Sequence, residues 1–309
     1  MTIQQALSQT FRKLRTEKLD TASLDAEVLL SWVLKKSKEY LFTYPEKKLT
    51  RRQIKKLKVL ATRRRKTEPI AYLVNHKEFY GLDFYINKNV LIPRPETEMI
   101  IDEVVMSLRG GRRRRTTKQS RLLSSACNDS LAIADIGTGS GAIIISLART
   151  LSPNTYHLTP ITYYATDISS AALKVAKKNA ITHGVKINFK RGNLFEPIKN
   201  KAIDILTANL PYLTEQEISS AKNSSLAYEP KGALAGGKDG LQLYEELFKQ
   251  VTADQNQPKL IIVEIGHRQA QAAKKLALKY FPAGQIEIKK DLADRNRILI
   301  IKKRFTNLL

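Results

Sequence analysis

Cysteine and long apolar runs are almost absent from this sequence of 309 residues. The single cysteine, Cys127, excludes an intrachain disulfide and a zinc site made of cysteines, which is typical of proteins in a reducing compartment. The longest apolar runs, such as residues 142–148, are far shorter than the roughly 18 residues that indicate a membrane span. The first residues lack the apolar core of a signal peptide. We therefore expect a soluble, cytoplasmic protein.

Acidic residues are also scarce, because 29 Asp and Glu stand against 53 Lys and Arg, for a formal net charge of +24. The excess is concentrated in residues 1–68, with 18 basic and seven acidic side chains, and in residues 109–121, with seven basic and no acidic ones. Such clusters attract polyanions, because binding releases counterions. Both clusters are therefore candidates for a contact with RNA or a ribosome. Solvated helix surfaces give the same composition, so the charge does not establish such a partner.

The length predicts about two domains, and 42% hydrophobic residues are enough for packed cores. Residues 1–75 have the pattern of a small helical bundle. Ser23 is the expected N-cap of one helix, with Leu24 and Trp32 on its apolar face, and Thr50 is the expected N-cap of another. Helices this short are stable only when they pack together.

Residues 76–98 have a different pattern, which predicts a β-hairpin and a linker. Aromatic and branched side chains over Phe79–Ile86 and Val90–Ile92 predict two short strands around a turn at Asn87–Asn89. A helix is expected over Thr97–Leu108.

Residues 99–309 form the third predicted segment, in which strands and helices alternate after a basic, flexible insert at 109–130. This alternation predicts an α/β fold with a mostly parallel sheet and helices on both faces. The last two strands would add an antiparallel hairpin at one edge. The seven expected strands span residues 131–136, 161–166, 186–190, 203–208, 260–265, 285–289 and 298–302.

A glycine-rich loop, Gly137-Thr138-Gly139-Ser140-Gly141, lies between the first of these strands and a helix. Glycines permit a tight turn and let a ligand approach the backbone, while the helix N-terminus offers free N–H donors. Asp167 ends the next strand, where a carboxylate can accept hydrogen bonds from two ribose hydroxyls. Because Gly137, Gly139 and Ala142 also fit the dinucleotide pattern, these residues suit NAD and an adenosyl cofactor about equally.

The tetrapeptide Asn209-Leu210-Pro211-Tyr212 follows the fourth strand and should project from the same edge of the sheet. A planar amide or aromatic amine is a poor nucleophile because its nitrogen lone pair is delocalised. An enzyme that methylates it must hold the two N–H hydrogens, for which an Asn side-chain oxygen and a backbone carbonyl are suitable acceptors. Proline stiffens this backbone, and a Tyr ring can pack on the flat substrate group. The pattern favours methyl transfer to a planar NH2 group.

These motifs are similar to those of class I S-adenosylmethionine-dependent methyltransferases with an [Asn/Asp/Ser]-Pro-Pro-[Tyr/Phe/Trp] motif. The match is closest to the HemK-type peptide-chain-release-factor glutamine methyltransferases, which the sequence resembles over about residues 65–302. The most specific part is the string Val90-Leu-Ile-Pro-Arg-Pro-Glu-Thr-Glu98. Further similar segments are Glu68–Tyr72, Glu78–Gly81, Asp135–Gly141, Tyr228–Pro230, Ala233–Gly240 and Val263–Gly266.

The resemblance implies a class I (Rossmann-like) methyltransferase fold and S-adenosylmethionine as cofactor, without a metal. It assigns the methionine portion to the loop Gly137–Gly141, the ribose to Asp167 and the adenine to Asn193 and Leu194. Asn209 would also lie beside the cofactor. The substrate would be bound by Asn209, Leu210, Pro211 and Tyr212, with Asn209, Pro211 and Tyr212 as the catalytic residues.

The substrate that the resemblance implies is the glutamine in the Gly-Gly-Gln loop of a peptide chain release factor. The products would be N5-methylglutamine and S-adenosylhomocysteine. Residues 1–75 correspond to the small domain that recruits the protein substrate in this family.

Three features depart from the family pattern. Leu210 stands where the motif usually has proline, so we expect reduced rigidity and a lower rate. Asn193 replaces a usual Asp and Leu194 a common aromatic residue, which predicts weaker cofactor binding. The arginine-rich stretch 109–121 is not a family feature, and it is either an RNA contact or an expanded linker.

Two other functions stay open at this point. The same catalyst could act on another planar NH2, such as adenine N6 in DNA or RNA or a glutamine of a ribosomal protein. Alternatively, the chain could be a non-catalytic protein that binds RNA or the ribosome and has a decayed cofactor site. The histidines His76, His157, His183 and His267 lack metal-ligand spacing, and Glu96, Glu98 and Glu264 could line the cleft or be buried or capping residues.

Overall fold

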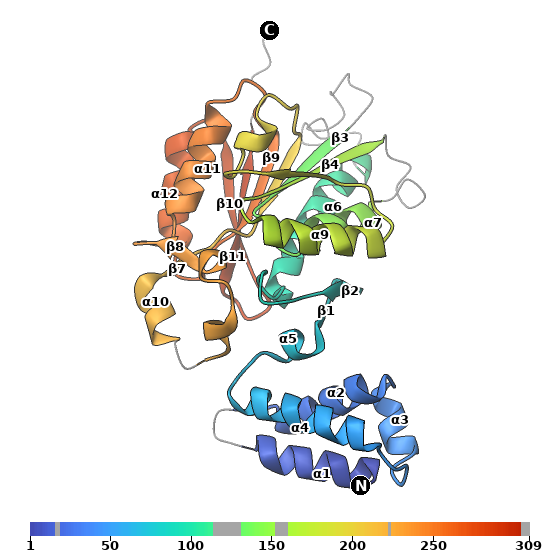
Figure 1. The fold of residues 1–309 in the computed structure, drawn as a ribbon. Helices are drawn as coiled ribbons and strands as arrows, with labels where there is room; N and C mark the ends of the chain where they lie inside the picture. Colours follow the sequence, from blue (N-terminus) through green and yellow to red (C-terminus); the bar gives the residue numbers. More distant parts are fainter. Residues whose placement is uncertain (16–18, 114–130, 152–159, 222–223, 304–309) are drawn as a thin grey trace. The chain divides into compact units, whose positions relative to one another are not determined.

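The computed structural model describes residues 1–15, 19–113, 131–151, 160–221 and 224–303 (Figure 1). The chain divides into two compact units. The helical unit contains Met1–His76, Ile86–Lys88 and Ser220–Glu229, and the sheet unit contains Lys77–Tyr85, Asn89–Ser219 and Pro230–Leu309. Most of the predicted basic insert, residues 114–130, lies outside the described residues.

The helical unit is built from short amphipathic helices around one apolar core. Residues such as Ile3, Leu29 and Leu57 are almost fully buried in this core, because each helix alone would leave its apolar face in water. The helices are α1 (Ile3–Leu14), α2 (Ala22–Leu34), α3 (Lys38–Thr43), α4 (Arg51–Arg65) and α5 (Ile70–Val74).

The two predicted helix starts in this unit have different outcomes. Thr50 caps α4 as predicted, in a capping box in which its hydroxyl accepts the Gln53 N–H and the Gln53 side chain accepts the Thr50 N–H. The prediction for Ser23 was wrong, because the N-cap of α2 is Thr21 and the helix begins at Ala22, two residues earlier than predicted. Its buried face consequently includes Ala22, Asp25, Ala26, Leu29, Leu30 and Val33, whereas Leu24 and Trp32 are 47% and 39% exposed.

The predicted hairpin exists, but its turn lies elsewhere. Strands β1 (His76–Phe79) and β2 (Leu82–Tyr85) are joined at Tyr80 and Gly81, whose φ angles are 52° and 69°. Two consecutive positive φ angles are typical of the tight turn that matches the twist of a hairpin, and glycine adopts such an angle without strain. The expected strand over Val90–Ile92 does not form.

The sheet unit contains a seven-stranded sheet in the order β10-β11-β9-β6-β3-β4-β5. Strand β3 is parallel to β4 and β6, and β11 is antiparallel to both of its neighbours. This confirms the predicted mostly parallel sheet with an antiparallel edge hairpin. The strands are β3 (Leu131–Ile136), β4 (Ile161–Asp167), β5 (Asn188–Arg191), β6 (Ile205–Ala208), β9 (Leu260–Glu264), β10 (Gln285–Lys290) and β11 (Asn296–Lys302).

Helices cover both faces of this sheet, with α11 and α12 on one face and α6, α7 and α9 on the other (Figure 1). Their bounds are α6 (Glu98–Arg113), α7 (Ala142–Thr150), α9 (Ser170–Thr182), α11 (Gln242–Thr252) and α12 (Ala270–Tyr280). Helix α6 continues five residues past the predicted end at Leu108, so the first residues of the predicted insert are helical. The shorter elements include η1 (Pro95–Thr97), η3 (Glu196–Ile198), β7 (Leu213–Thr214), α10 (Glu215–Ser220), η5 (Lys231–Ala233) and β8 (Ala235–Gly237).

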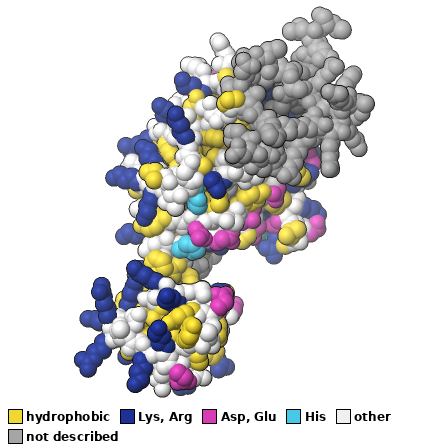
Figure 2. Space-filling model, turned by 90° about the vertical axis from the view of Figure 1, so that its right-hand side faces the viewer, with side chains coloured by type: hydrophobic (Ala, Val, Ile, Leu, Met, Phe, Trp, Pro, Cys, Tyr) yellow, Lys and Arg dark blue, Asp and Glu magenta, His cyan; other side chains and the backbone are white. Residues whose placement is uncertain are grey.

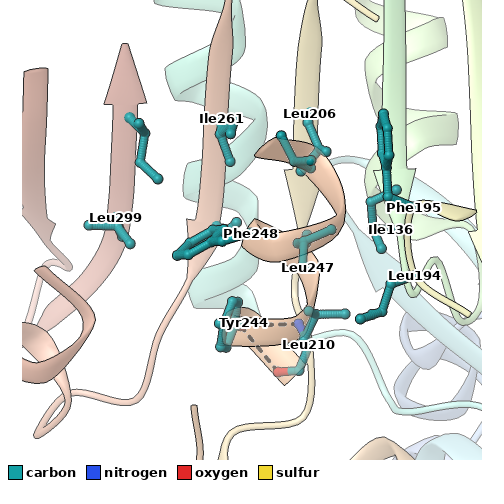
Figure 3. Close-up of a cluster of buried hydrophobic side chains, with 14 of the residues drawn as sticks. Ile136, Leu194, Phe195, Leu206, Leu210, Tyr244, Leu247, Phe248, Ile261 and Leu299 are labelled. Carbon is teal, nitrogen blue, oxygen red and sulfur yellow. Dashed lines mark hydrogen bonds between the residues drawn. The ribbon is translucent and has the colours of Figure 1, made fainter. Parts of the chain in front are cut away.

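The apolar core of the sheet unit explains why the central strands are continuous hydrophobic runs. All residues of β6 and β9 are buried, because helices cover both faces of a parallel sheet. Figure 3 shows Leu247 and Phe248 of α11 packed over Leu206 and Ile261 of the sheet. Within the described part of the chain, no helix combines the length and apolar character that a membrane span requires.

Candidate active site

The glycine-rich loop leaves strand β3 and enters helix α7, as the sequence predicts. Gly137, Gly139 and Gly141 all have positive φ angles, of 67°, 56° and 82°. A Cβ atom at Gly137 would lie 2.9 Å from the Leu210 Cδ2 atom, and one at Gly141 would lie 2.8 Å from Ile145 Cδ1. A side chain at either position would strain the backbone and displace its neighbour, so glycine is favoured there and leaves the loop backbone bare.

Asp167 ends β4 beside this loop, and its carboxylate is held by two backbone donors. One oxygen accepts the Gly139 N–H at 2.9 Å, and the other accepts the Ser169 N–H at 2.8 Å. Burial raises the pKa of Asp167, while these two N–H groups lower it. Each carboxylate oxygen has a further acceptor position, so the group can still accept hydroxyl hydrogens.

Asn193 and Leu194 follow β5 and close the same region. Leu194 is buried and has a positive φ of 48°, and its carbonyl accepts the Thr166 hydroxyl at 2.8 Å. Its side chain belongs to the same apolar core as Leu210, toward which it points in Figure 3. Leu194 thus offers an apolar surface at the place where the family commonly has an aromatic ring.

Asn209 follows β6, and its side-chain amide is bonded to a residue that the sequence did not single out. Its Nδ2 donates to the Thr97 hydroxyl at 3.0 Å. The Thr97 hydroxyl donates to the Glu264 carboxylate at 2.6 Å, and the Tyr212 hydroxyl donates to the other oxygen of that carboxylate at 3.1 Å. Burial raises the pKa of Tyr212 and that of Glu264.

Leu210 is fixed through its backbone by Tyr244 of α11 (Figure 3). The Leu210 N–H donates to the Tyr244 hydroxyl oxygen at 3.2 Å. That hydroxyl lies 3.3 Å from the Leu210 carbonyl and nearer to the Glu264 carbonyl. Because a hydroxyl has one proton, donation to Glu264 leaves the Leu210 carbonyl available as an acceptor.

These segments enclose a cavity of about 530 Å³ in the sheet unit. It opens between the glycine loop, the ends of β4, β5 and β6, and two further segments, 89–97 and 230–243. The predicted site residues in its wall are Gly137, Thr138, Gly139, Ser140, Asp167, Asn193, Leu194, Asn209, Leu210 and Pro211. Gly141 and Tyr212 lie next to wall residues in the chain but outside that set.

Comparisons with known proteins identify the family of the chain. Residues 5–74 match the family model described as the PrmC N-terminal domain, and residues 127–279 match a methyltransferase domain. A release factor glutamine methyltransferase of Moorella thermoacetica is 33% identical over 306 residues, which cover 98% of this chain and 99% of that protein. The chain belongs to the release factor glutamine methyltransferase family.

Two further comparisons define the limits of this similarity. A bifunctional methyltransferase of Rickettsia bellii is 36% identical over 312 residues, but this chain spans only 54% of its length. The hMettl16 catalytic domain, solved in complex with MAT2A 3'UTR hairpin 1, aligns with a TM-score of 0.55 and 14% identity over 90% of this chain and 92% of the other. At that identity the likeness concerns the fold alone.

Within the family fold, the three candidate glutamates of the sequence have different surroundings. Glu264 is buried at the end of β9 and joins the Asn209 network. The Glu98 carboxylate accepts the N–H of Tyr80, a residue of the hairpin turn, at 2.8 Å. Glu96 is exposed. Across the described residues, no three His, Cys, Asp or Glu side chains are grouped as a metal site requires, and the prediction of a metal-free reaction stays a prediction.

Thr97 and Tyr244 are the site residues that sequence reasoning missed. Thr97 lies inside the string Pro93-Arg-Pro-Glu-Thr-Glu98, so its position was within a recognised motif but its side chain was given no role. Tyr244 is one of several apolar residues on α11 and differs from an ordinary core residue only in its hydroxyl. Only the packing of α11 against the end of β6 reveals that this hydroxyl meets Leu210.

Proposed function

We propose that the chain transfers a methyl group from S-adenosylmethionine to the side-chain amide nitrogen of a glutamine in the Gly-Gly-Gln loop of a peptide chain release factor. The observation that carries this proposal is a shared cavity, whose wall contains the glycine loop, Asp167, Asn209 and Leu210. Membership in the release factor glutamine methyltransferase family supports the choice of substrate.

The residues around the cavity fit an adenosyl cofactor. The bare backbone at Gly137 and Gly139 suits the methionine portion, and the Asp167 carboxylate has acceptor positions for ribose hydroxyls. The Asn193 side chain can accept from an adenine amino group, beside the apolar surface of Leu194. When bound, S-adenosylmethionine would supply an electrophilic methyl group and leave as S-adenosylhomocysteine.

Asn209 and Leu210 would prepare the substrate nitrogen. The Asn209 Oδ1 and the Leu210 carbonyl can each accept one hydrogen of the glutamine NH2, which fixes the plane of the amide and directs its nitrogen lone pair. As the nitrogen gains its new bond to carbon it becomes more positive, and both acceptors stabilise that charge. One N–H proton then passes to water, which leaves neutral N5-methylglutamine. Pro211 and Tyr212 would hold this backbone and flank the amide.

The helical unit would contact the macromolecular partner, and residues 1–75 are proposed as the segment that recruits the release factor. Helix α4 carries eight Lys and Arg and no acidic residue. Arg63 is paired with Glu68, and Arg64 with Asp25. The other six basic side chains of α4 are exposed: Arg51, Arg52, Lys55, Lys56, Lys58 and Arg65. In Figure 2 the helical unit shows Lys and Arg side chains gathered on one side. We propose that this face of α4 contacts RNA, for example of the ribosome, in the cytoplasm.

Asn209→Ala tests the proposed role of the site. The purified chain and its variant are incubated with S-adenosylmethionine and a release factor, and the methylated residue is located by peptide mass spectrometry. We expect the wild-type chain to methylate the Gly-Gly-Gln glutamine, and Asn209→Ala to lose turnover while calorimetric binding of S-adenosylmethionine persists.

Parallel reactions with DNA, RNA and ribosomal proteins cover the alternative substrates. Methylation of one of these instead of the release factor would replace the proposed substrate. Normal turnover by Asn209→Ala would refute the role of Asn209, and absence of saturable S-adenosylmethionine binding by the wild-type chain would favour a non-catalytic protein.

A further inference from the structure

The side-chain amide of Asn209 has two orientations of nearly equal shape but opposite chemistry. With Oδ1 toward the substrate it accepts an N–H hydrogen, whereas with Nδ2 toward the substrate it presents a donor to another donor. Rotation about one bond exchanges the two. The proposed reaction therefore requires something that selects between them.

The contacts of Asn209 supply that selection. Its Nδ2 lies 3.0 Å from the Thr97 hydroxyl, which lies 2.6 Å from the Glu264 carboxylate. Thr97 is 4% exposed and Glu264 1% exposed, so water does not compete for these bonds. Thr97 ends η1, while Glu264 ends β9, and the three residues are brought together from distant parts of the sequence.

When the Glu264 carboxyl group is ionised, the hydrogen count along this chain of bonds allows one direction only. An ionised carboxylate accepts hydrogens and cannot donate them, so the single proton of the Thr97 hydroxyl points to Glu264. The Thr97 oxygen can then only accept, and Asn209 must present its NH2 to it. Oδ1 of Asn209 is thereby left for the cavity, where the substrate amide is proposed to bind.

Two neighbours hold Glu264 in this role. The Tyr212 hydroxyl donates to its second oxygen at 3.1 Å, so the carboxylate is bound on both sides. Arg297 of β11 lies close enough to favour its negative charge, and Arg297 is itself paired with Asp291 at 3.1 Å. These contacts oppose the effect of burial on the carboxyl group.

We propose that Thr97 and Glu264 are positioning residues that fix the Asn209 amide with its oxygen toward the substrate. This inference rests on the proposed function, because it assigns the orientation that methylation of an amide requires. Neither residue needs to contact the substrate for this role.

Thr97→Val and Thr97→Ser form a matched pair that tests the proposal. Valine keeps the shape of threonine and removes the hydroxyl, whereas serine keeps the hydroxyl. We expect Thr97→Val to lower kcat for release-factor methylation by about 10- to 100-fold, because a wrongly oriented Asn209 amide would no longer position the substrate nitrogen for attack. The Kd for S-adenosylmethionine should change little, and Thr97→Ser should keep most of the wild-type kcat.

Glu264→Gln provides a second variant of almost the same shape. The new amide can donate to the Thr97 oxygen, which frees the Thr97 proton for Asn209 Oδ1 and favours the wrong orientation. We expect a lower kcat with a melting temperature close to that of the wild type. If Thr97→Val does not fold, Glu264→Gln alone decides the proposal.

A readout that does not depend on activity is the side-chain NH2 signal of Asn209 in a 15N-labelled protein, assigned by its disappearance in Asn209→Ala. Its hydrogen exchange should be slow in the wild type and in Thr97→Ser and faster in Thr97→Val. The proposal would be overturned if Thr97→Val kept the wild-type kcat and slow exchange. It would also be overturned if Thr97→Val and Thr97→Ser lowered kcat equally. An inactive wild-type chain with the expected exchange pattern would instead refute the proposed function and leave the orientation of Asn209 established.

Discussion

Leu210 shows at the residue scale how a departure from a family motif is accommodated. Proline would restrain the backbone through its ring, but it has no N–H. Leu210 has an N–H group, which donates to the Tyr244 hydroxyl oxygen. The same hydroxyl donates its own proton to the Glu264 carbonyl. The carbonyl proposed to bind the substrate is thus held by a hydrogen bond that proline could not make. The expected lower rate stays a prediction.

Tyr244→Phe should therefore destabilise the protein and slow the reaction. Removal of the hydroxyl leaves the buried Leu210 N–H without its acceptor, which costs about 1–3 kcal/mol in the free energy of unfolding. The matched control is Tyr280→Phe, because the Tyr280 hydroxyl bonds Glu245 at the surface at 3.2 Å and should contribute less than about 0.5 kcal/mol. Urea unfolding and kcat measure both effects, and equal results for the two variants would contradict this role of Tyr244.

Asp135, at the end of β3, should make stability depend on pH. Burial raises its pKa from 3.8 to about 7, although the hydroxyls of Thr138 and Thr207 donate to it at 2.6 Å and 3.0 Å. An acid with a raised pKa favours the folded state when protonated, so its contribution is full below about pH 4 and is lost as the pH rises through about 7. We expect the melting temperature of the wild type to fall between pH 5 and pH 8 by more than that of Asp135→Asn. Parallel curves for the two proteins would exclude this effect.

Elements were predictable from the sequence where the local pattern and the packing agree. The bounds of β3 are the predicted ones, because its run of buried residues marks the strand from end to end. The turn at Tyr80 and Gly81 was missed because it lies inside an aromatic run that has strand propensity on both sides. The site follows the same rule. Its loops could be predicted because they follow strands with recognisable ends. The contact of Tyr244 with Leu210 could not be predicted, because it depends on how α11 packs.

The pair Asp25–Arg64 joins two helices of the helical unit and is a test at the element scale. Arg64 Nε lies 2.7 Å from the Asp25 carboxylate, with side chains 12% and 7% exposed. Asp25→Asn removes the charge that balances Arg64, which we expect to lower the free energy of unfolding of this unit by about 3 kcal/mol. Asp20→Asn, at an exposed position shortly before α2, should change it by less than about 0.5 kcal/mol. Similar values for both variants, measured by denaturant unfolding, would show that the pair is not structural.

The charge of the whole molecule is asymmetric, and the exposed basic side chains of α4 are the clearest described part of that asymmetry. Binding to RNA through this face predicts a steep salt dependence. Replacing Arg51, Arg52 and Lys55 by Ala should reduce the slope of log K against log salt by about one for each phosphate group that is no longer neutralised.

The control for this experiment is Lys274→Ala with Lys275→Ala, which removes exposed charge from α12 in the sheet unit. This variant should keep the wild-type slope in a fluorescence titration with ribosomal RNA. The same reduction in both variants would indicate attraction by net charge alone, and a slope of zero in the wild type would exclude the RNA contact.

We propose that the cavity of the sheet unit binds and methylates a release-factor glutamine. The most direct test of this proposal is transfer of label from methyl-labelled S-adenosylmethionine to a purified release factor, beside the same factor with Gln→Ala in its Gly-Gly-Gln loop. We expect label on the unaltered factor and none on the Gln→Ala factor. Equal labelling of both factors, or label that appears only on nucleic acid, would contradict the proposal.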